Sequence, residues 1–151
     1  MQNEDQIMVL NDLVKINNDR IEGYRKASEN LRDHNMELLS VFNDCINDSQ
    51  TNREELIAQV RRLGGDYDEG TTISGKIYRM WMDVKATFGG DDAAGVLASC
   101  EGGEDAAKNA YKAALESNYL DTQSHAIIIN QQRQQLAAHE RIKLLRERYS
   151  D

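Results

Sequence analysis

The strongest constraint on this chain is a set of long segments in which apolar residues recur at steps of three and four, with no proline anywhere. Such spacing gathers apolar side chains on one face of an α-helix. Proline breaks or kinks a helix interior, so its absence permits helices of many turns. No segment alternates between apolar and polar residues for long enough to form a sheet. The sequence predicts long helices over about 5–31, 33–63, 91–117 and 121–149, and a shorter one over 73–88.

The connections between these segments predict how the helices are arranged. The first two long helices are joined by only a couple of residues, so they should be antiparallel neighbours. The second and third are separated by residues 64–90, a length that can cross a bundle from end to end. A crossover of this kind distinguishes ferritin-like bundles from simple up-down-up-down bundles. We therefore expect one all-α domain over residues 1–151, a ferritin-like four-helix bundle whose long crossover contains a short extra helix.

Composition narrows the classes of function. The net charge of −8 disfavours direct binding to nucleic acid or to an anionic membrane, because both carry negative charge. No stretch approaches the roughly 18 apolar residues of a membrane span. The first ten residues lack the basic and apolar regions of a signal peptide. Two distant cysteines do not make a disulfide framework. These features indicate a cytoplasmic protein with reduced thiols.

An internal repeat relates the two halves of the chain. The segment "NNDRIEGYRKASE" begins at Asn17, and "EDAAKNAYKAALE" begins at Glu104. Both have tyrosine in the eighth place, Tyr24 and Tyr111, so each pair is offset by 87 residues. The same offset carries Phe42 onto Ile129. We interpret the halves as two copies of one helical hairpin.

Each long helix also carries a polar residue near the middle of its expected inner face. With the offset of 87, the inner face of the last helix passes through Gln132, Leu136 and His139. Buried polar groups cost free energy unless they are paired. We therefore expect a shared polar network at mid-bundle. Its expected members are Asn17, Tyr24, Ser49, Asn52, Arg53, Glu104, Tyr111 and His139.

Several motifs carry a resemblance to a known family. They are "INNDRIEGYRKA", "VRRLGG", "YRMWMDVK", "CEGGEDAAKNAYKAAL" and a histidine in the last helix. On these motifs, which span nearly the whole chain, the protein resembles the ferritin-like superfamily. More closely, it resembles an uncharacterised bacterial group of four-helix-bundle proteins classed as a domain of unknown function. By analogy with other ferritin-like proteins, the resemblance implies a stress-related role.

The resemblance also implies where a metal centre would lie. Di-iron ferritin-like bundles use a Glu from the first and third helices and a Glu-x-x-His pair from the second and fourth. In this chain those positions correspond to Asn17, Glu104, Ser49 with Asn52, and Leu136 with His139. Only Glu104 and His139 keep the expected residue type. No Glu-x-x-His or Asp-x-x-His occurs in the sequence, so the resemblance implies a degenerate di-iron site.

Two interpretations of this centre remain open. In the first, Glu104 and His139 share a hydrogen bond within the network, and Arg53 neutralises Glu104. This interpretation predicts a non-enzymatic structural or interaction protein with no cofactor. In the second, Glu104 and His139 bind iron or manganese, and the protein binds or stores metal. The small number of carboxylates favours the first interpretation.

The short helix over 73–88 bears on assembly. Met80, Trp81 and Met82 are consecutive, so they cannot all face one core. This helix therefore either covers an end of the bundle or meets a second subunit. We expect a homo-oligomer, with a dimer favoured, and the sequence identifies no other protein partner.

Overall fold

The computed structural model describes residues 2–31, 35–67 and 92–150. Over these residues the chain forms four helices and no strand. They are α1 (Gln2–Asn30), α2 (Met36–Arg62), α4 (Ala93–Glu116) and α5 (Thr122–Tyr149). The expected all-α four-helix bundle is thereby confirmed. The short helix expected over 73–88, with Met80, Trp81 and Met82, lies outside the described residues.

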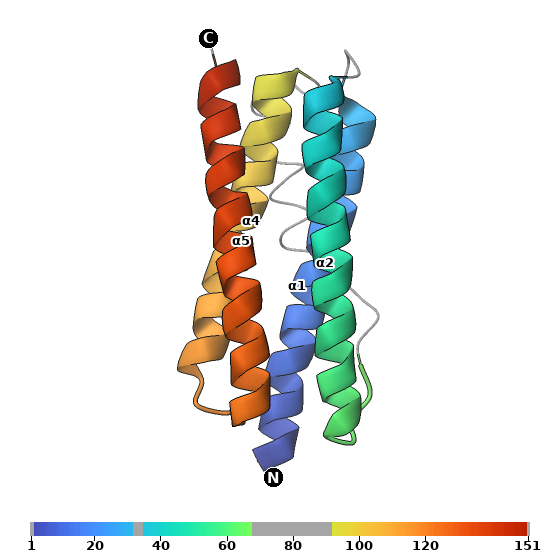
Figure 1. Ribbon diagram of the computed structural model, residues 1–151, viewed down its shortest axis with the longest axis vertical. Helices are drawn as coiled ribbons and strands as arrows, with labels where there is room; N and C mark the ends of the chain where they lie inside the picture. Colours follow the sequence, from blue (N-terminus) through green and yellow to red (C-terminus); the bar gives the residue numbers. More distant parts are fainter. Residues whose placement is uncertain (1, 32–34, 68–91, 151) are drawn as a thin grey trace.

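The directions of the helices give the bundle a crossed topology (Figure 1). α1 and α5 run one way along the long axis, and α2 and α4 run the other way. α2 therefore ends at one end of the bundle, and α4 begins at the opposite end. This arrangement agrees with the crossover that the length of residues 64–90 predicts.

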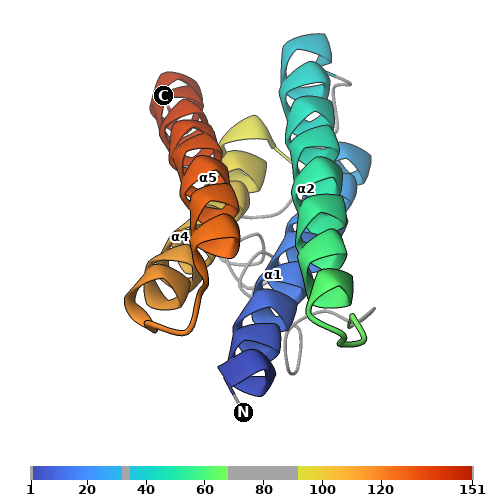
Figure 2. The same cartoon turned by 60° about the horizontal axis from the view of Figure 1, so that its bottom comes forward.

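The helices pack as two hairpins. α1 packs along α2 to form the N-terminal hairpin, and α4 packs along α5 to form the C-terminal hairpin. The hairpins meet mainly through α1 and α4, whereas α2 and α5 approach each other at few positions. Figure 2, in which the lower end of the bundle is turned toward the viewer, shows the same two pairs of helices. The α1–α4 contact is therefore the principal junction between the halves of the molecule.

Local sequence signals explain where the helices begin and end. The side chains of Asn35, Asp92 and Asp121 accept hydrogen bonds from the first-turn amides of α2, α4 and α5. These are favoured N-cap residues, because they satisfy amides that lack a partner within the helix. α2 ends at "LGG", where Gly64 has a φ of 84°. Glycine adopts this left-handed conformation without steric cost, so it ends the helix there.

Two apolar clusters form the core on either side of a polar middle. One cluster includes Phe42, Leu97 and Ile142, and the other includes Leu13 and Leu56. In α1, α2 and α5, Asn17, Ser49 with Asn52, and Gln131 with Gln135 lie between residues of the two clusters, and in α4 Glu104 lies one turn before Ala107 of the first cluster. The polar groups therefore occupy the waist of the bundle. None of the helices described has the length and apolar character needed to cross a membrane.

The hairpins repeat each other, but with two different offsets. The N-caps Asn35 and Asp121 are 86 residues apart. The same offset of 86 links buried positions of α2 with buried positions of α5. The pairs are Leu38 with Ser124, Phe42 with Ile128, Cys45 with Gln131, Ser49 with Gln135, Leu56 with Ile142, and Gln59 with Leu145.

This second offset corrects the expected inner face of α5. The offset of 87 that fits α1 and α4 is wrong by one residue for the second pair of helices. α1 ends at Asn30 and α4 ends at Glu116, so the ends of these two helices are already separated by 86 residues and not by 87. One residue turns a helix by about 100°. As a result Leu136 is 38% exposed, and Gln135 points inward instead.

Candidate functional site: a buried polar layer

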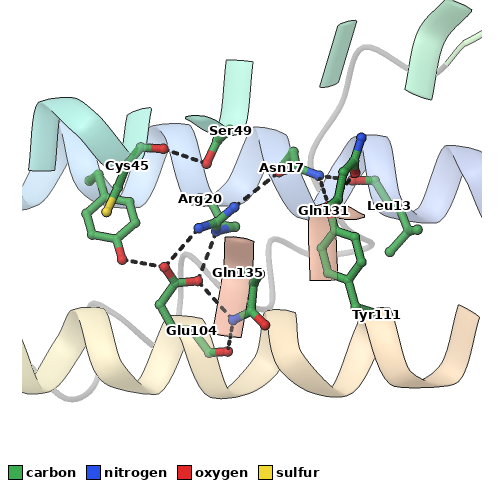
Figure 3. Close-up of polar contacts among 10 residues, drawn as sticks. Leu13, Asn17, Arg20, Cys45, Ser49, Glu104, Tyr111, Gln131 and Gln135 are labelled. Carbon is green, nitrogen blue, oxygen red and sulfur yellow. Dashed lines mark hydrogen bonds and ion pairs between the residues drawn. The ribbon is translucent and has the colours of Figure 1, made fainter. Parts of the chain in front are cut away.

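The centre of the bundle contains a bidentate ion pair between α1 and α4 (Figure 3). Arg20 Nε donates to Glu104 Oε1 at 2.9 Å, and Arg20 Nη2 donates to Oε2 at 3.0 Å. Both side chains are 0% exposed. A two-pronged, charge-assisted contact of this kind fixes orientation as well as charge. The pair therefore neutralises both ions and joins the two hairpins at their main junction.

The Glu104 carboxylate also accepts hydrogen bonds from two other side chains. Tyr24 donates its hydroxyl to Oε2 at 2.5 Å. Gln135 Nε2 donates to the main-chain oxygen of Glu104 at 2.9 Å and to Oε1 at 3.3 Å. A carboxylate offers about four lone-pair sites. Two donors from Arg20, one from Tyr24 and one from Gln135 fill all four.

A second set of contacts continues from Arg20 toward α5. Arg20 Nη1 donates to Asn17 Oδ1 at 3.4 Å. Asn17 Nδ2 donates to the main-chain oxygen of Leu13 and to the Tyr111 hydroxyl, both at 2.9 Å. Tyr111 in turn donates to Gln131 Oε1 at 2.7 Å. The residues Asn17, Arg20, Tyr24, Glu104, Tyr111, Gln131 and Gln135 thus form one connected group, which we call the polar layer (Figure 3).

The polar layer reaches the surface through Gln131. Its Nε2 donates to the main-chain oxygen of Asn52 at 3.1 Å and to Glu55 Oε1 at 2.9 Å. Glu55 is exposed. These bonds add a link between α5 and α2, which otherwise make few contacts. The polar layer therefore ties all four helices together at one level.

The repeat is visible inside the polar layer as two crossed contacts. Tyr24 of α1 bonds to Glu104 of α4, and Tyr111 of α4 bonds to Asn17 of α1. Positions 17 and 104, and positions 24 and 111, are each 87 residues apart. The two contacts are therefore equivalent in position but different in charge. Only one of them involves a carboxylate.

Burial and charge determine how these groups titrate. Burial lowers the pKa of Arg20, but the charge and hydrogen bonds of Glu104 outweigh this effect, so the pKa is raised and the guanidinium stays charged. Burial, together with the negative charge of Glu104, raises the pKa of Tyr24 well above its usual value. Burial is also the main reason that the pKa of Tyr111 rises to about 12. Both tyrosines therefore remain neutral at ordinary pH.

The two cysteines lie in the neighbouring core. Burial, followed by the charge of Glu104, raises the pKa of Cys45 to about 11. Burial and the proximity of Cys45 raise the pKa of Cys100 well above its usual value. The thiolate is the reactive form of cysteine. Both thiols are thus held protonated, and the arrangement does not provide a nucleophile.

The expected partners of Glu104 need correction. Arg53 does not neutralise it: Arg53 donates to Asn18 at 3.1 Å and to Glu54 at 3.5 Å, which places its guanidinium beside α1 and α2. Arg20 takes that role because it lies on the same face of α1 as Asn17 and Tyr24. Arg20 lies three residues after Asn17 and four residues before Tyr24. This spacing places all three on one helix face, so the sequence already indicated that Arg20 faces inward.

His139 is also not a partner of Glu104. Its Nε2 lies 2.5 Å from Oδ1 of Asp105, on the edge of the α4–α5 contact. The one-residue change of register turns position 139 away from the centre and brings Gln135 there. Gln131 and Gln135 were missed for the same reason. Ser49 is buried but bonds to the main-chain oxygen of Cys45, and Asn52 contributes its carbonyl group.

The side chains at the centre do not fit a metal ion. Within the described parts of the chain, no three His, Cys, Asp or Glu side chains gather in a way that could hold one. Glu104 and His139 do not converge. The lone pairs of Glu104 are occupied, and any added cation would face the buried positive charge of Arg20. The centre thus holds a guanidinium paired with a carboxylate.

Comparison with protein-family models places most of the chain in a described family. The family model described as "Domain of unknown function (DUF2383)" matches residues 5–117. These residues include most of α1 and all of α2 and α4, and with them both partners of the buried ion pair. A search of curated proteins found no match.

Proposed function

The chain belongs to the DUF2383 family, and from that premise we propose that it is a non-enzymatic structural or interaction bundle of ferritin-like descent. In this proposal the Arg20–Glu104 pair occupies the level at which di-iron bundles hold their metals. The directions of the helices and the mid-bundle position of Glu104 support the ferritin-like relationship.

One observation carries the proposal: the guanidinium of Arg20 binds both oxygens of Glu104 inside a fully buried layer. Iron or manganese bound by carboxylates needs free oxygen lone pairs and a surplus of negative charge. Here the positive charge is supplied by the protein itself, and the carboxylate oxygens are engaged. The centre therefore suits holding helices in place better than it suits holding a metal.

Metal content provides the test. The protein is expressed in iron- and manganese-supplemented medium, and metal per chain is determined for the wild type and for Glu104→Gln. We expect both proteins to contain well below one metal ion per chain, with no difference between them. Glu140→Gln, which changes an exposed carboxylate of α5, is the matched control for weak surface binding.

The opposite result is equally clear. Stoichiometric iron or manganese in the wild type that is lost in Glu104→Gln and retained in Glu140→Gln would overturn the proposal. It would show that a metal displaces Arg20 from Glu104. Metal that is retained in Glu104→Gln would instead reflect binding away from the bundle centre and would agree with the proposal.

A further inference from the structure

The two hairpins are alike in their helix caps and in the positions that they bury, so packing of a hairpin against a copy of itself is an alternative to the observed junction. Their second helices are capped at equivalent positions and bury side chains at equivalent positions, with an offset of 86. Their first helices, α1 and α4, pack on each other through crossed contacts at equivalent positions. Two copies of the chain therefore offer three possible junctions: α1 on α4, α1 on α1, and α4 on α4.

Contact geometry alone does not select among them. If α1 packed on α1 of a second copy, Asn17 of each chain would meet Tyr24 of the other. That contact is of the same type as the observed bond between Asn17 and Tyr111. If α4 packed on α4, Glu104 would meet Tyr111, which resembles the observed bond between Tyr24 and Glu104.

Charge separates the three junctions. At offset 87 the counterpart of Arg20 is Ala107, and the counterpart of Glu104 is Asn17. Each first helix therefore carries a single ion of the polar layer, positive on α1 and negative on α4. Within the polar layer, an α1–α1 junction would place two guanidinium groups together with no carboxylate of the layer, and an α4–α4 junction would place two carboxylates together with no guanidinium. Uncompensated buried charge is strongly unfavourable.

We infer that the α1 and α4 faces are interaction surfaces that recognise each other through the Arg20–Glu104 pair, which excludes pairing of either hairpin with a second copy of itself. The pair thus selects the partner of each hairpin. The fully buried position of both ions makes this selection strong, because neither charge can turn to solvent. The neutral contact between Asn17 and Tyr111 completes the junction but carries no selectivity of this kind.

The test removes both charges from the full-length chain. In Arg20→Met/Glu104→Gln the two ions of the polar layer are gone, so this layer is neutral in all three junctions. Size-exclusion chromatography with light scattering compares this variant with the wild type over a hundredfold range of concentration. We expect the variant to form reversible species of at least twice the wild-type mass, in proportions that rise with concentration.

A charge exchange provides the matched control. Arg20→Glu/Glu104→Arg keeps opposite charges on α1 and α4 while altering the local geometry, so we expect it to retain the wild-type distribution of masses. If the neutral variant keeps the wild-type distribution at every concentration, the inference is wrong. It is also wrong if the neutral variant does not fold, because the pair would then be needed for stability rather than for selection.

Discussion

At the scale of single residues, Glu104 shows how much depends on its neighbours. A carboxylate with no exposure is unfavourable in isolation. Four hydrogen-bond donors and the positive charge of Arg20 compensate this carboxylate, so it can be buried in the core. The sequence predicted that Asn17, Tyr24, Glu104 and Tyr111 face inward, because their spacing places them on inner faces. It did not predict that Arg20 completes the group, since a buried arginine is unusual without its partner in view.

The tyrosines of the polar layer should make the protein sensitive to alkaline pH. The pKa of Tyr111 rises from 10.0 to about 12 on folding, mainly through burial. Between these values the unfolded chain releases a proton that the folded chain keeps, so the free energy of unfolding should fall as pH rises from 10 toward 12. Urea unfolding at several pH values should show this fall, and Tyr111→Phe should make it shallower.

A matched control is Tyr119→Phe, because Tyr119 is exposed. This variant should keep the wild-type dependence on pH. An unchanged slope in Tyr111→Phe would argue against a neutral, buried phenol at position 111. Tyr24 contributes in the same direction, so some alkaline loss of stability should remain in the Tyr111 variant.

At the scale of elements, the positions of the helices were predictable but the rotation of one helix was not. Apolar spacing, caps and the "LGG" stop locate all four described helices to within a few residues. The inner face of α5 was extrapolated from the first half of the chain with an offset of 87. The change to 86 occurs near the end of α4, where no apolar periodicity marks the register. Because of this one-residue error, Leu136 and His139 were expected to face the centre, whereas Gln135 is the residue that does.

The register of α5 can be tested with two substitutions. Leu136→Gln changes an exposed side chain, so the free energy of unfolding should stay within about 0.5 kcal/mol of the wild type. Ile142→Ala removes part of a fully buried side chain and should cost roughly 2–5 kcal/mol. Chemical denaturation measures both. A large loss in Leu136→Gln would restore the register that the offset of 87 predicted.

At the scale of the whole molecule, the bundle is two related hairpins joined at a charged centre. Apolar clusters above and below that centre supply the burial that drives folding. The polar layer adds little net free energy by comparison, because the cost of desolvating two ions offsets most of their attraction. What it adds is a fixed orientation and register between α1 and α4. That role is consistent with a structural or interaction protein and does not require a bound metal.

The most direct measurement for this account is a double-mutant cycle on the central pair, with Arg20→Met, Glu104→Gln and the combined variant. Each single change leaves one buried ion without its partner and should lower the free energy of unfolding by about 3–5 kcal/mol. The combined variant should lose far less than the sum of the single losses, because neither charge remains. If the loss in the combined variant equals the sum of the single losses, Arg20 and Glu104 do not act as a pair, and their ion pair does not hold the two hairpins in register.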